Sequence, residues 1–327
     1  MSKYCIGIDL GGTFIKFCLL SDTGEATGLF QLPTPSEGGP DAVIQQMAGG
    51  AERLLKASDV DRRDILGVGI GSPGPLDLDA GVVREMPNLP GFSNVPIRDR
   101  VGEALNMPAM LENDANAAAF GEHLCGAGEG LGDMVLLTLG TGVGGGVIID
   151  GKVFHGAHGM GAELGHMIIV PGGKQCNCGQ RGCVEKYCSA SNLAQHAMEQ
   201  VRRRGNSSVL AEMMSAKGSL DARDVQEAMG RSDSLAEELW DRTTYYLALA
   251  CVNVCRIFDP DEVVLAGGMA KAGDHLIEPV RRHVSELNWS MSKPLTKIAI
   301  ARLGNDAGVI GAAGVAMQEF ADGKSES

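Results

Sequence analysis

Short apolar runs separated by turn residues dominate the start of the chain. Residues 4–9 and 14–20 are two such runs on either side of a Gly-Gly-Thr bend, and residues 26–32 form a third after another turn. Apolar runs of this length bounded by glycine-containing turns are typical of β-strands. The pattern therefore predicts that the chain opens with a three-stranded meander.

The next hundred residues alternate between helical and strand patterns. Residues 41–58 place apolar side chains three and four positions apart, with Asp41 at the start, which indicates an amphipathic helix. The same criteria predict a strand at 65–74, a helix at 95–106, a strand at 108–114 and an alanine-rich helix at 115–128. Alternating strands and helices are typical of the α/β class.

The opening pattern then returns in the middle of the chain. Residues 9–20 and 138–149 both place a Gly/Thr turn between two apolar strands, within a strand-turn-strand-turn-strand pattern at 133–156. A weak internal duplication of this kind indicates two related domains that face each other. After residue 188 the chain is expected to be mostly helical, with a long buried helix at 235–260, a strand at 262–270 and a last helix at 306–320.

Composition and charge narrow the class of protein. The 327 residues include 46 glycines, 44% hydrophobic residues and a net charge of −13. An acidic chain offers no basic face for phosphate backbones, so we expect no nucleic-acid partner. We find no export signal and no apolar run long enough to span a membrane, which predicts a cytoplasmic protein with reduced thiols.

Three of the nine cysteines lie within eight residues, at Cys176, Cys178 and Cys183, and His166 lies ten residues before the first. A disulfide, a redox centre and buried thiols are the alternatives. One residue between Cys176 and Cys178 is too short a spacing for an unstrained disulfide. A redox pair would have two residues between its thiols. Three thiols and a histidine instead form the ligand set of a structural Zn²⁺ site. The other six cysteines lie in apolar segments and are expected to be buried thiols.

The two Gly/Thr turns are candidate phosphate-binding loops. In isolation each is as well explained by an ordinary hairpin turn. As phosphate loops, their glycines would let backbone N–H groups approach the phosphates, and Thr13 would offer a hydroxyl. Asp9 could hold Mg²⁺ through water. Lys16, beyond the first turn, is either a phosphate ligand or a surface charge.

Asn113 and Asp114 stand where a predicted strand ends and a helix begins. Helix capping is the commonest reason for these residue types at that position. The functional alternative is a carboxylate that accepts the proton of an attacking hydroxyl group during phosphoryl transfer. A helix N-terminus keeps such a carboxylate ionised.

Seven motifs together resemble the ROK family of sugar kinases and repressors. In chain order they are DLGGTFIK, GSPGP, PNLPGF, LENDANAAAFGE, LGTGVGGGV, GAELGHM and CNCGQRGCVE. The resemblance runs from residue 6 to about residue 315 and is nearest to the bacterial ATP-dependent glucokinases. It implies the actin-like ATPase (ribonuclease H-like) fold, with two α/β lobes around a central cleft. We place the smaller lobe at 1–118, with a helix at about 305–321 packed back on it, and the larger lobe at 119–304.

The resemblance also implies a role for each motif residue. Asp114 would be the catalytic base. The sugar ligands would be Asn88, Asn113, Asp114, Glu163, His166 and Glu185. The ATP and Mg²⁺ ligands would be Asp9, Gly11, Gly12, Thr13, Lys16, Thr138, Gly140, Thr141, Gly142, Gly144, Gly267 and Gly268. The zinc ligands would be His166, Cys176, Cys178 and Cys183. Gly74 would lie in the sugar-side loop. Phe92 stands where the family often has Trp, which weakens the assignment of Asn88.

The implied activity is phosphorylation of a hexose at its 6-hydroxyl by ATP, most simply glucose to glucose 6-phosphate. N-acetylmannosamine, N-acetylglucosamine, fructose and allose are alternative substrates, because the same polar ligands serve related kinases. A sugar-sensing protein without catalytic activity is a third alternative, but the intact Asp114 argues against it. The family also implies a homodimer or homotetramer.

Overall fold

The computed structural model describes residues 2–86, 89–205, 208–289 and 295–321. Contacts divide the chain into two compact units. The first comprises Met1–Gly130, Gly146–Ala162 and Arg302–Ser327, and the second comprises Leu131–Gly145 and Glu163–Ala301. This division assigns residues 119–130 to the first unit, whereas we expected the smaller lobe to end at residue 118.

The first unit is built on a mixed five-stranded sheet. Its elements in chain order are β1 (Tyr4–Leu10), β2 (Phe14–Ser21), β3 (Ala26–Pro33), α1 (Gly39–Ala57), β4 (Ile65–Ser72), β5 (Leu76–Asp77), β6 (Val82–Glu85), β7 (Ser93–Val95), α2 (Ile97–Leu105), β8 (Ala109–Asn113), α3 (Asp114–Cys125), β11 (Lys152–Val153) and α10 (Ala307–Ala321). The sheet order is β3-β2-β1-β4-β8. β1, β2 and β3 pair antiparallel, which confirms the predicted meander, and β1, β4 and β8 run parallel.

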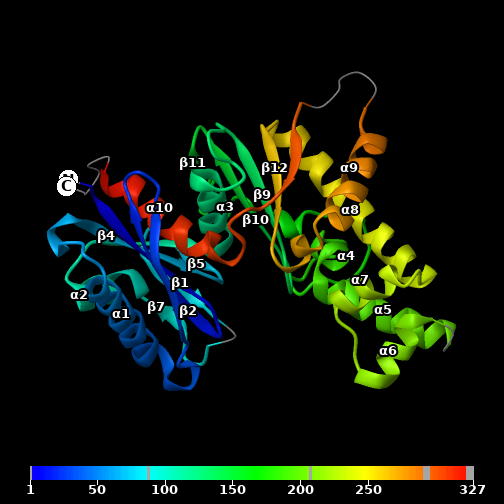
Figure 1. Cartoon of the computed structure of the whole chain (residues 1–327), viewed down its shortest axis with the longest axis horizontal. Helices are drawn as coiled ribbons and strands as arrows, with labels where there is room; N and C mark the ends of the chain where they lie inside the picture. Colours follow the sequence, from blue (N-terminus) through cyan, green and yellow to red (C-terminus); the bar gives the residue numbers. More distant parts are fainter. Residues whose placement is uncertain (1, 87–88, 206–207, 290–294, 322–327) are drawn as a thin grey trace. The chain divides into compact units, whose positions relative to one another are not determined.

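Helices cover both faces of this sheet (Figure 1). Strand side chains alternate between the two faces. Ile6, Ile8 and Leu10 of β1 therefore join a core with α1 and α2. Cys5 of the same strand belongs to a second core, which includes residues of α10. Asp9 shares the α10 face with Cys5, which places the polar end of β1 next to the start of α10.

Close backbone contact explains part of the high glycine content. A Cβ atom on Gly69 of β4 would lie 1.8 Å from the carbonyl oxygen of Ala312 in α10. A Cβ atom on Gly311 would lie 1.6 Å from the carbonyl oxygen of Ala117 in α3. Any larger residue would therefore push α10 away from the sheet or from α3.

A buried carboxylate holds the chain where it re-enters the first unit. Glu122 of α3 is 0% exposed. Its two oxygens accept the backbone N–H groups of Ala127 at 2.9 Å, Arg302 at 3.0 Å and Leu303 at 2.8 Å. Arg302 is the first residue after the chain leaves the second unit. Glu122 thus fixes the segment that precedes α10.

Two smaller strand groups complete the first unit. β5, β6 and β7 form a separate antiparallel sheet. β10 (Val143–Ile149) begins in the second unit and ends in the first, where it pairs antiparallel with β11. The segment that follows β11 leads towards Glu163.

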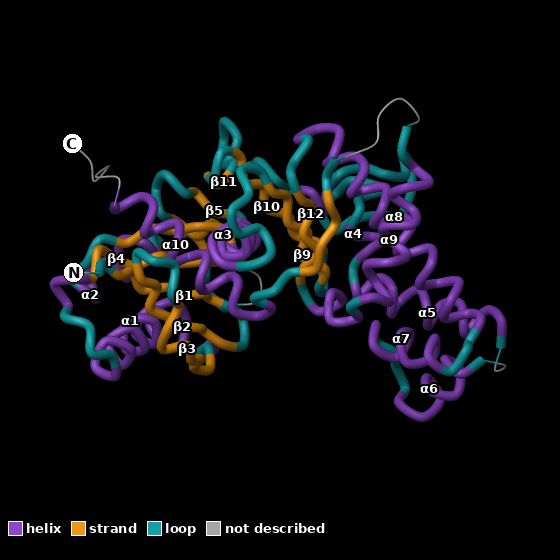
Figure 2. Tube along the Cα trace, turned by 45° about the horizontal axis from the view of Figure 1, so that its top comes forward, coloured by secondary structure: helices purple, strands orange, loops and turns teal. Residues whose placement is uncertain are grey.

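The second unit combines parallel strands with a helical layer. Its further elements are β9 (Met134–Leu139), α4 (Glu185–Cys188), α5 (Ala190–Arg204), α6 (Val209–Lys217), α7 (Ala222–Gly230), α8 (Ser234–Phe258), β12 (Glu262–Ala266), α9 (Asp274–Leu287) and β13 (Lys297–Ile300). β12 pairs in parallel with β9 and with β13. Figure 2 shows the helices of this unit grouped together, and α8 packs against α9. Among the described helices, none is both long and apolar enough to cross a membrane.

Candidate active site

The first Gly/Thr turn is a tight, solvent-facing bend between β1 and β2. The Gly11 N–H group donates to the Phe14 carbonyl at 3.0 Å. The Thr34 N–H group donates to the Thr13 carbonyl at 2.9 Å, and the Thr34 hydroxyl donates to the Gly11 carbonyl at 2.7 Å. Gly12 and Thr13 are exposed. The turn is thus held from one side by Thr34 and presents its tip to solvent.

Asp9 and Lys16 flank this turn as a direct cross-strand pair. They are opposite each other in the register of β1 and β2, and Lys16 Nζ lies 3.1 Å from Asp9 Oδ2. Lys16 also donates to the carbonyl of Asn305, just before α10. From the sequence, Lys16 is either a phosphate ligand or a surface charge. The structure instead places its ammonium group against Asp9.

Asn113 and Asp114 lie at the junction of β8 and α3. The Asn113 side chain accepts the N–H groups of Ala115 at 2.9 Å and Asn116 at 3.2 Å, which is an N-cap. Asp114 is the first residue of α3 and is half-buried, and its Oδ1 accepts the Ala115 N–H group at 2.8 Å. The capping interpretation therefore holds for Asn113. Asp114 has its carboxylate at the positive end of the helix dipole, which favours the ionised form.

A contact between a buried carboxylate and a partly exposed imidazole next to this junction was not foreseen from the sequence. The Glu112 side chain is 2% exposed, and its Oε2 lies 2.7 Å from His155 Nε2. The hydrogen bond to Glu112 raises the pKa of His155, burial opposes that shift, and the charges of Glu112 and Asp79 add to it. His155 follows β11, about forty residues from Glu112, and the sequence carries no sign of that contact.

The second Gly/Thr turn connects β9 to β10. Thr138 Oγ1 accepts the Gly144 N–H group at 3.1 Å, and the Gly140 N–H group donates to the Gly142 carbonyl at 3.0 Å. Thr141 at the tip is exposed. Gly267, with φ +87°, follows β12, and a Cβ atom on it would lie 2.6 Å from the carbonyl oxygen of Leu139. Gly267 and the adjacent Gly268 therefore lie beside the beginning of this turn.

Glu185 contacts both this turn and the cysteine loop, which is the segment 176–183 with Cys176, Cys178 and Cys183. Its Oε2 accepts the Val143 N–H group at 3.2 Å, and a Cβ atom on Gly142 would lie 2.4 Å from the same oxygen. Its Oε1 lies 3.9 Å from Cys176 Sγ. From the sequence, Glu185 is either a sugar ligand or a solvated surface charge. The contacts place it inside the second unit instead.

His166 and the three clustered cysteines come together as predicted for a metal site. One ligand atom from each of His166, Cys176, Cys178 and Cys183 lies within 4.8 Å of every other. The Sγ atoms of Cys178 and Cys183 are 3.7 Å apart, and Cys176 Sγ is 3.8 Å from His166 Nδ1. Zn²⁺ with tetrahedral bonds of about 2.0–2.3 Å would separate these atom pairs by about 3.6–3.8 Å. The distances therefore fit such an ion.

Cys178 and Cys183 of this set differ in their surroundings. A backbone hydrogen bond from Gln180 lowers the pKa of exposed Cys178, whereas burial raises the pKa of Cys183 to about 12.

Glu163 lies three residues before His166 at the start of a 3₁₀ turn, and its side chain is exposed. The apolar residues around Glu163 in the sequence predict an interior position, and the exposed side chain contradicts that prediction.

Of the two residues predicted for the sugar-side loops, the structure describes only Gly74. Asn88 lies outside the described residues. Gly74 has φ +97°, and a Cβ atom there would lie 2.6 Å from the Glu85 carbonyl oxygen, so the position requires glycine. Phe92 is 3% exposed and belongs to the core that contains α1 and α2.

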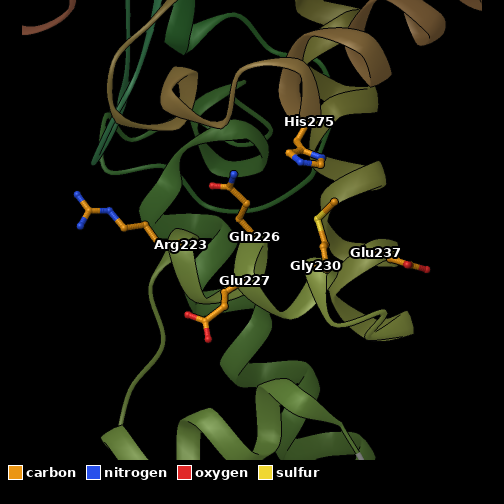
Figure 3. A pocket seen from close by; sticks show the side chains of 7 residues that line it. Arg223, Gln226, Glu227, Gly230, Glu237 and His275 are labelled. Atoms are coloured by element: carbon orange, nitrogen blue, oxygen red, sulfur yellow. The ribbon is translucent and has the colours of Figure 1, made fainter.

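A pocket of about 340 Å³ lies among α7, α8 and α9 (Figure 3). Residues of mixed charge line it: Arg223, Gln226, Glu227, Met229, Gly230, Glu237 and His275. It shares no residue with the predicted nucleotide, sugar or zinc sites. The chemistry expected from the motifs therefore does not involve this pocket.

Comparisons with known proteins match this chain over nearly its full length. The sequence pattern of the ROK family matches residues 5–319. A glucokinase of Halalkalibacterium halodurans is 37% identical over 318 residues, covering 97% of this chain and 96% of that protein. A crystal structure of a ROK hexokinase from Thermus thermophilus has a TM-score of 0.83 at 35% identity and covers 99% of this chain and 100% of that one. A crystal structure of a ROK family glucokinase from Streptomyces griseus, in complex with glucose and AMPPNP, has a TM-score of 0.79 at 31% identity. The match covers 96% of this chain and 99% of that one.

Proposed function

Because the chain belongs to the ROK family, we propose that it is an ATP-dependent glucokinase, which transfers the γ-phosphoryl group of ATP to the 6-hydroxyl of glucose. Relatives named glucokinase support this choice of sugar, and a similar structure holds glucose together with AMPPNP, an ATP analogue. The observation that carries the proposal is Asp114 at the N-terminus of α3, directly after the Asn113 cap.

Asp114 accepts the proton of the attacking hydroxyl group. Phosphoryl transfer depends mainly on positioning and charge stabilisation, with an aspartate orienting the nucleophile. The helix dipole keeps this carboxylate ionised and therefore able to accept a proton. The first helical turn after it is fixed, because Asn113 caps the N–H groups of Ala115 and Asn116, and Asp114 itself also accepts the Ala115 N–H group.

The sugar is held by several fixed polar groups, which a site needs to select one arrangement of hydroxyls. We assign this role to Asn113, Glu163, His166 and Glu185. Asn88, which lies outside the described residues, is the fifth proposed ligand. Glu185 also contacts the second Gly/Thr turn through the Val143 N–H group. A group shared in this way couples the position of the sugar to the position of the nucleotide loop.

The two Gly/Thr turns bind the phosphates of ATP. Their exposed tips at Gly12, Thr13 and Thr141 offer backbone N–H and hydroxyl groups, as anion-binding nests do. Asp9 provides the carboxylate oxygen that suits Mg²⁺, which would neutralise phosphate charge when bound. Lys16 lies against Asp9 and adds a positive charge at the same place.

The Cys₃His cluster holds a structural Zn²⁺ ion. Four ligand atoms within 4.8 Å match the closed tetrahedral site that this ligand set forms, and no open position remains for catalysis. Nδ1 of His166 faces the cysteines, which leaves Nε2 for a sugar hydroxyl.

The enzyme acts as a homodimer or homotetramer in the cytoplasm, as proposed from the family.

Replacement of Asp114 by Asn tests the assigned mechanism. The amide keeps the shape of the side chain and removes its basicity, so kcat should fall by about 10²–10⁴-fold. Glucose affinity, measured by titration calorimetry, should change only a few-fold. A folded Asp114→Asn protein with near-wild-type turnover would contradict the assigned mechanism.

A further inference from the structure

Thr34 is a buried polar residue that belongs to none of the predicted ligand sets. It follows β3, which pairs antiparallel with β2, and the pairing of Phe14 with Pro33 brings it alongside the first Gly/Thr turn. Thr34 is 9% exposed. Its hydroxyl donates to the Gly11 carbonyl at 2.7 Å, and its N–H group donates to the Thr13 carbonyl at 2.9 Å. Thr34 therefore holds the turn at two carbonyl groups.

The contact with the Gly11 carbonyl sets the direction of the next N–H group along the chain. The peptide units of the described residues are all trans, and the C=O and N–H bonds of a planar trans unit point in opposite directions. The Gly11 carbonyl and the Gly12 N–H group belong to one such unit. Because the carbonyl is bound to the Thr34 hydroxyl, the Gly12 N–H group points away from Thr34.

The other hydrogen bonds of the turn make Gly12 the position from which the backbone can reach a phosphate. The Gly11 N–H group is already bound to the Phe14 carbonyl at 3.0 Å. Gly12 is exposed, whereas Thr34 lies on the buried side of the turn. Backbone N–H groups that point out of a bend form the concave sites that bind anions. The Thr34 hydroxyl thus acts on the inner side of a peptide unit whose outer side faces solvent.

We propose that Thr34 is a positioning residue for ATP, whose hydroxyl group orients the Gly12 N–H group towards a phosphate. This inference rests on the proposed role of the first Gly/Thr turn in binding the phosphates. Thr34 itself is buried and acts only through the peptide unit between Gly11 and Gly12.

A structural hydrogen bond and a positioning hydrogen bond differ in which substrate they affect. Loss of a merely structural bond lowers the melting temperature and leaves the affinities for ATP and glucose in their original ratio. Loss of the orientation of the Gly12 N–H group weakens ATP binding alone, because none of the proposed sugar ligands lies in this turn. A hydrogen bond to a charged group contributes enough that its loss weakens binding about tenfold.

The experiment compares Thr34→Val, Thr34→Ser and Thr27→Val with the wild type. Valine has nearly the shape of threonine but no hydroxyl, and the bond from the backbone N–H group to the Thr13 carbonyl remains possible. Serine keeps the hydroxyl. Thr27 is an exposed threonine of β3, so its replacement by valine is the matched control.

Titration calorimetry measures the binding of AMPPNP with Mg²⁺, ADP release gives the KM values for ATP and glucose, and circular dichroism checks folding. Thr34→Val should weaken AMPPNP binding and raise the ATP KM about tenfold, with the glucose KM nearly unchanged. Thr34→Ser and Thr27→Val should both keep the wild-type values.

Wild-type AMPPNP affinity in folded Thr34→Val overturns the inference, and so does an equal rise of the glucose KM. If that variant fails to fold, Thr34→Ala decides in the same way, because it also lacks the hydroxyl and needs less space.

Calorimetry separates this inference from the proposed function, because AMPPNP binding requires neither Asp114 nor a sugar. A wild-type protein that binds AMPPNP but releases no ADP with any sugar overturns the proposed function, and the affinity of Thr34→Val still decides the role of Thr34. A wild-type protein that does not bind AMPPNP overturns both.

Discussion

Asn113 combines two tasks that single substitutions can separate. It caps α3 through two backbone N–H groups, and its amide is proposed to contact the sugar. Aspartate caps a helix as well as asparagine does, but it lacks the amide donor. Asn113→Asp should therefore keep the free energy of unfolding and raise the glucose KM about tenfold. Asn113→Ala should raise the KM similarly and also lower the free energy of unfolding by about 1 kcal/mol.

Denaturant unfolding and steady-state kinetics on both variants provide the comparison. Equal glucose KM values in Asn113→Asp and the wild type would show that this residue only caps the helix. The ATP KM is the internal reference, since Asn113 is not assigned to the nucleotide.

At the residue scale, the motifs could indicate which side chains carry chemistry but not which of them pair. Asp114 and the four proposed zinc ligands could be named as candidates from residue type, position and spacing. The Asp9–Lys16 pair depends on the strand register, and the Glu112–His155 pair depends on the path of a loop some forty residues later. Such contacts are set by tertiary packing, which local sequence patterns do not encode.

The cysteine loop joins two proposed sugar ligands, because His166 lies three residues after Glu163 and Cys183 lies two residues before Glu185. Removal of Cys178 should release this arrangement. Cys178→Ala should therefore contain less than the one zinc per chain expected in the wild type. Its glucose KM should rise more than its ATP KM. Elemental analysis and steady-state kinetics measure these quantities.

A cysteine of α8 supplies the control for that experiment. Cys255 is partly buried and lies outside the cluster, so Cys255→Ala should retain zinc and both KM values. A zinc-free, folded Cys178→Ala protein with full glucose affinity would leave the loop without a part in binding.

At the element scale, the long periodic segments were predictable and the short ones were not. The helix expected at 41–58 is α1, and the buried helix expected at 235–260 is α8. The short strands β5 and β7 have two and three residues, too few to show a period of two. Glu122 is a related case, since its sequence neighbours give no sign that it anchors Arg302.

At the scale of the whole molecule, the duplicated Gly/Thr turns and the alternation of strands and helices were enough to predict the α/β class. The motif order then identified the family and its fold. The boundary between the units was harder to predict, because the chain crosses between them four times and α3 continues beyond the expected end of the first lobe. Contacts between distant segments decide such a boundary.

Glucose-dependent ADP release by the purified protein, compared across a panel of sugars, tests the central claim most directly. Glucose, N-acetylmannosamine, N-acetylglucosamine, fructose and allose are each supplied with ATP and Mg²⁺. We expect the highest kcat/KM with glucose, with one glucose 6-phosphate formed for each ADP. A higher kcat/KM with another sugar would contradict the proposed substrate. Glucose binding without ADP release from any sugar would contradict the assignment as a kinase.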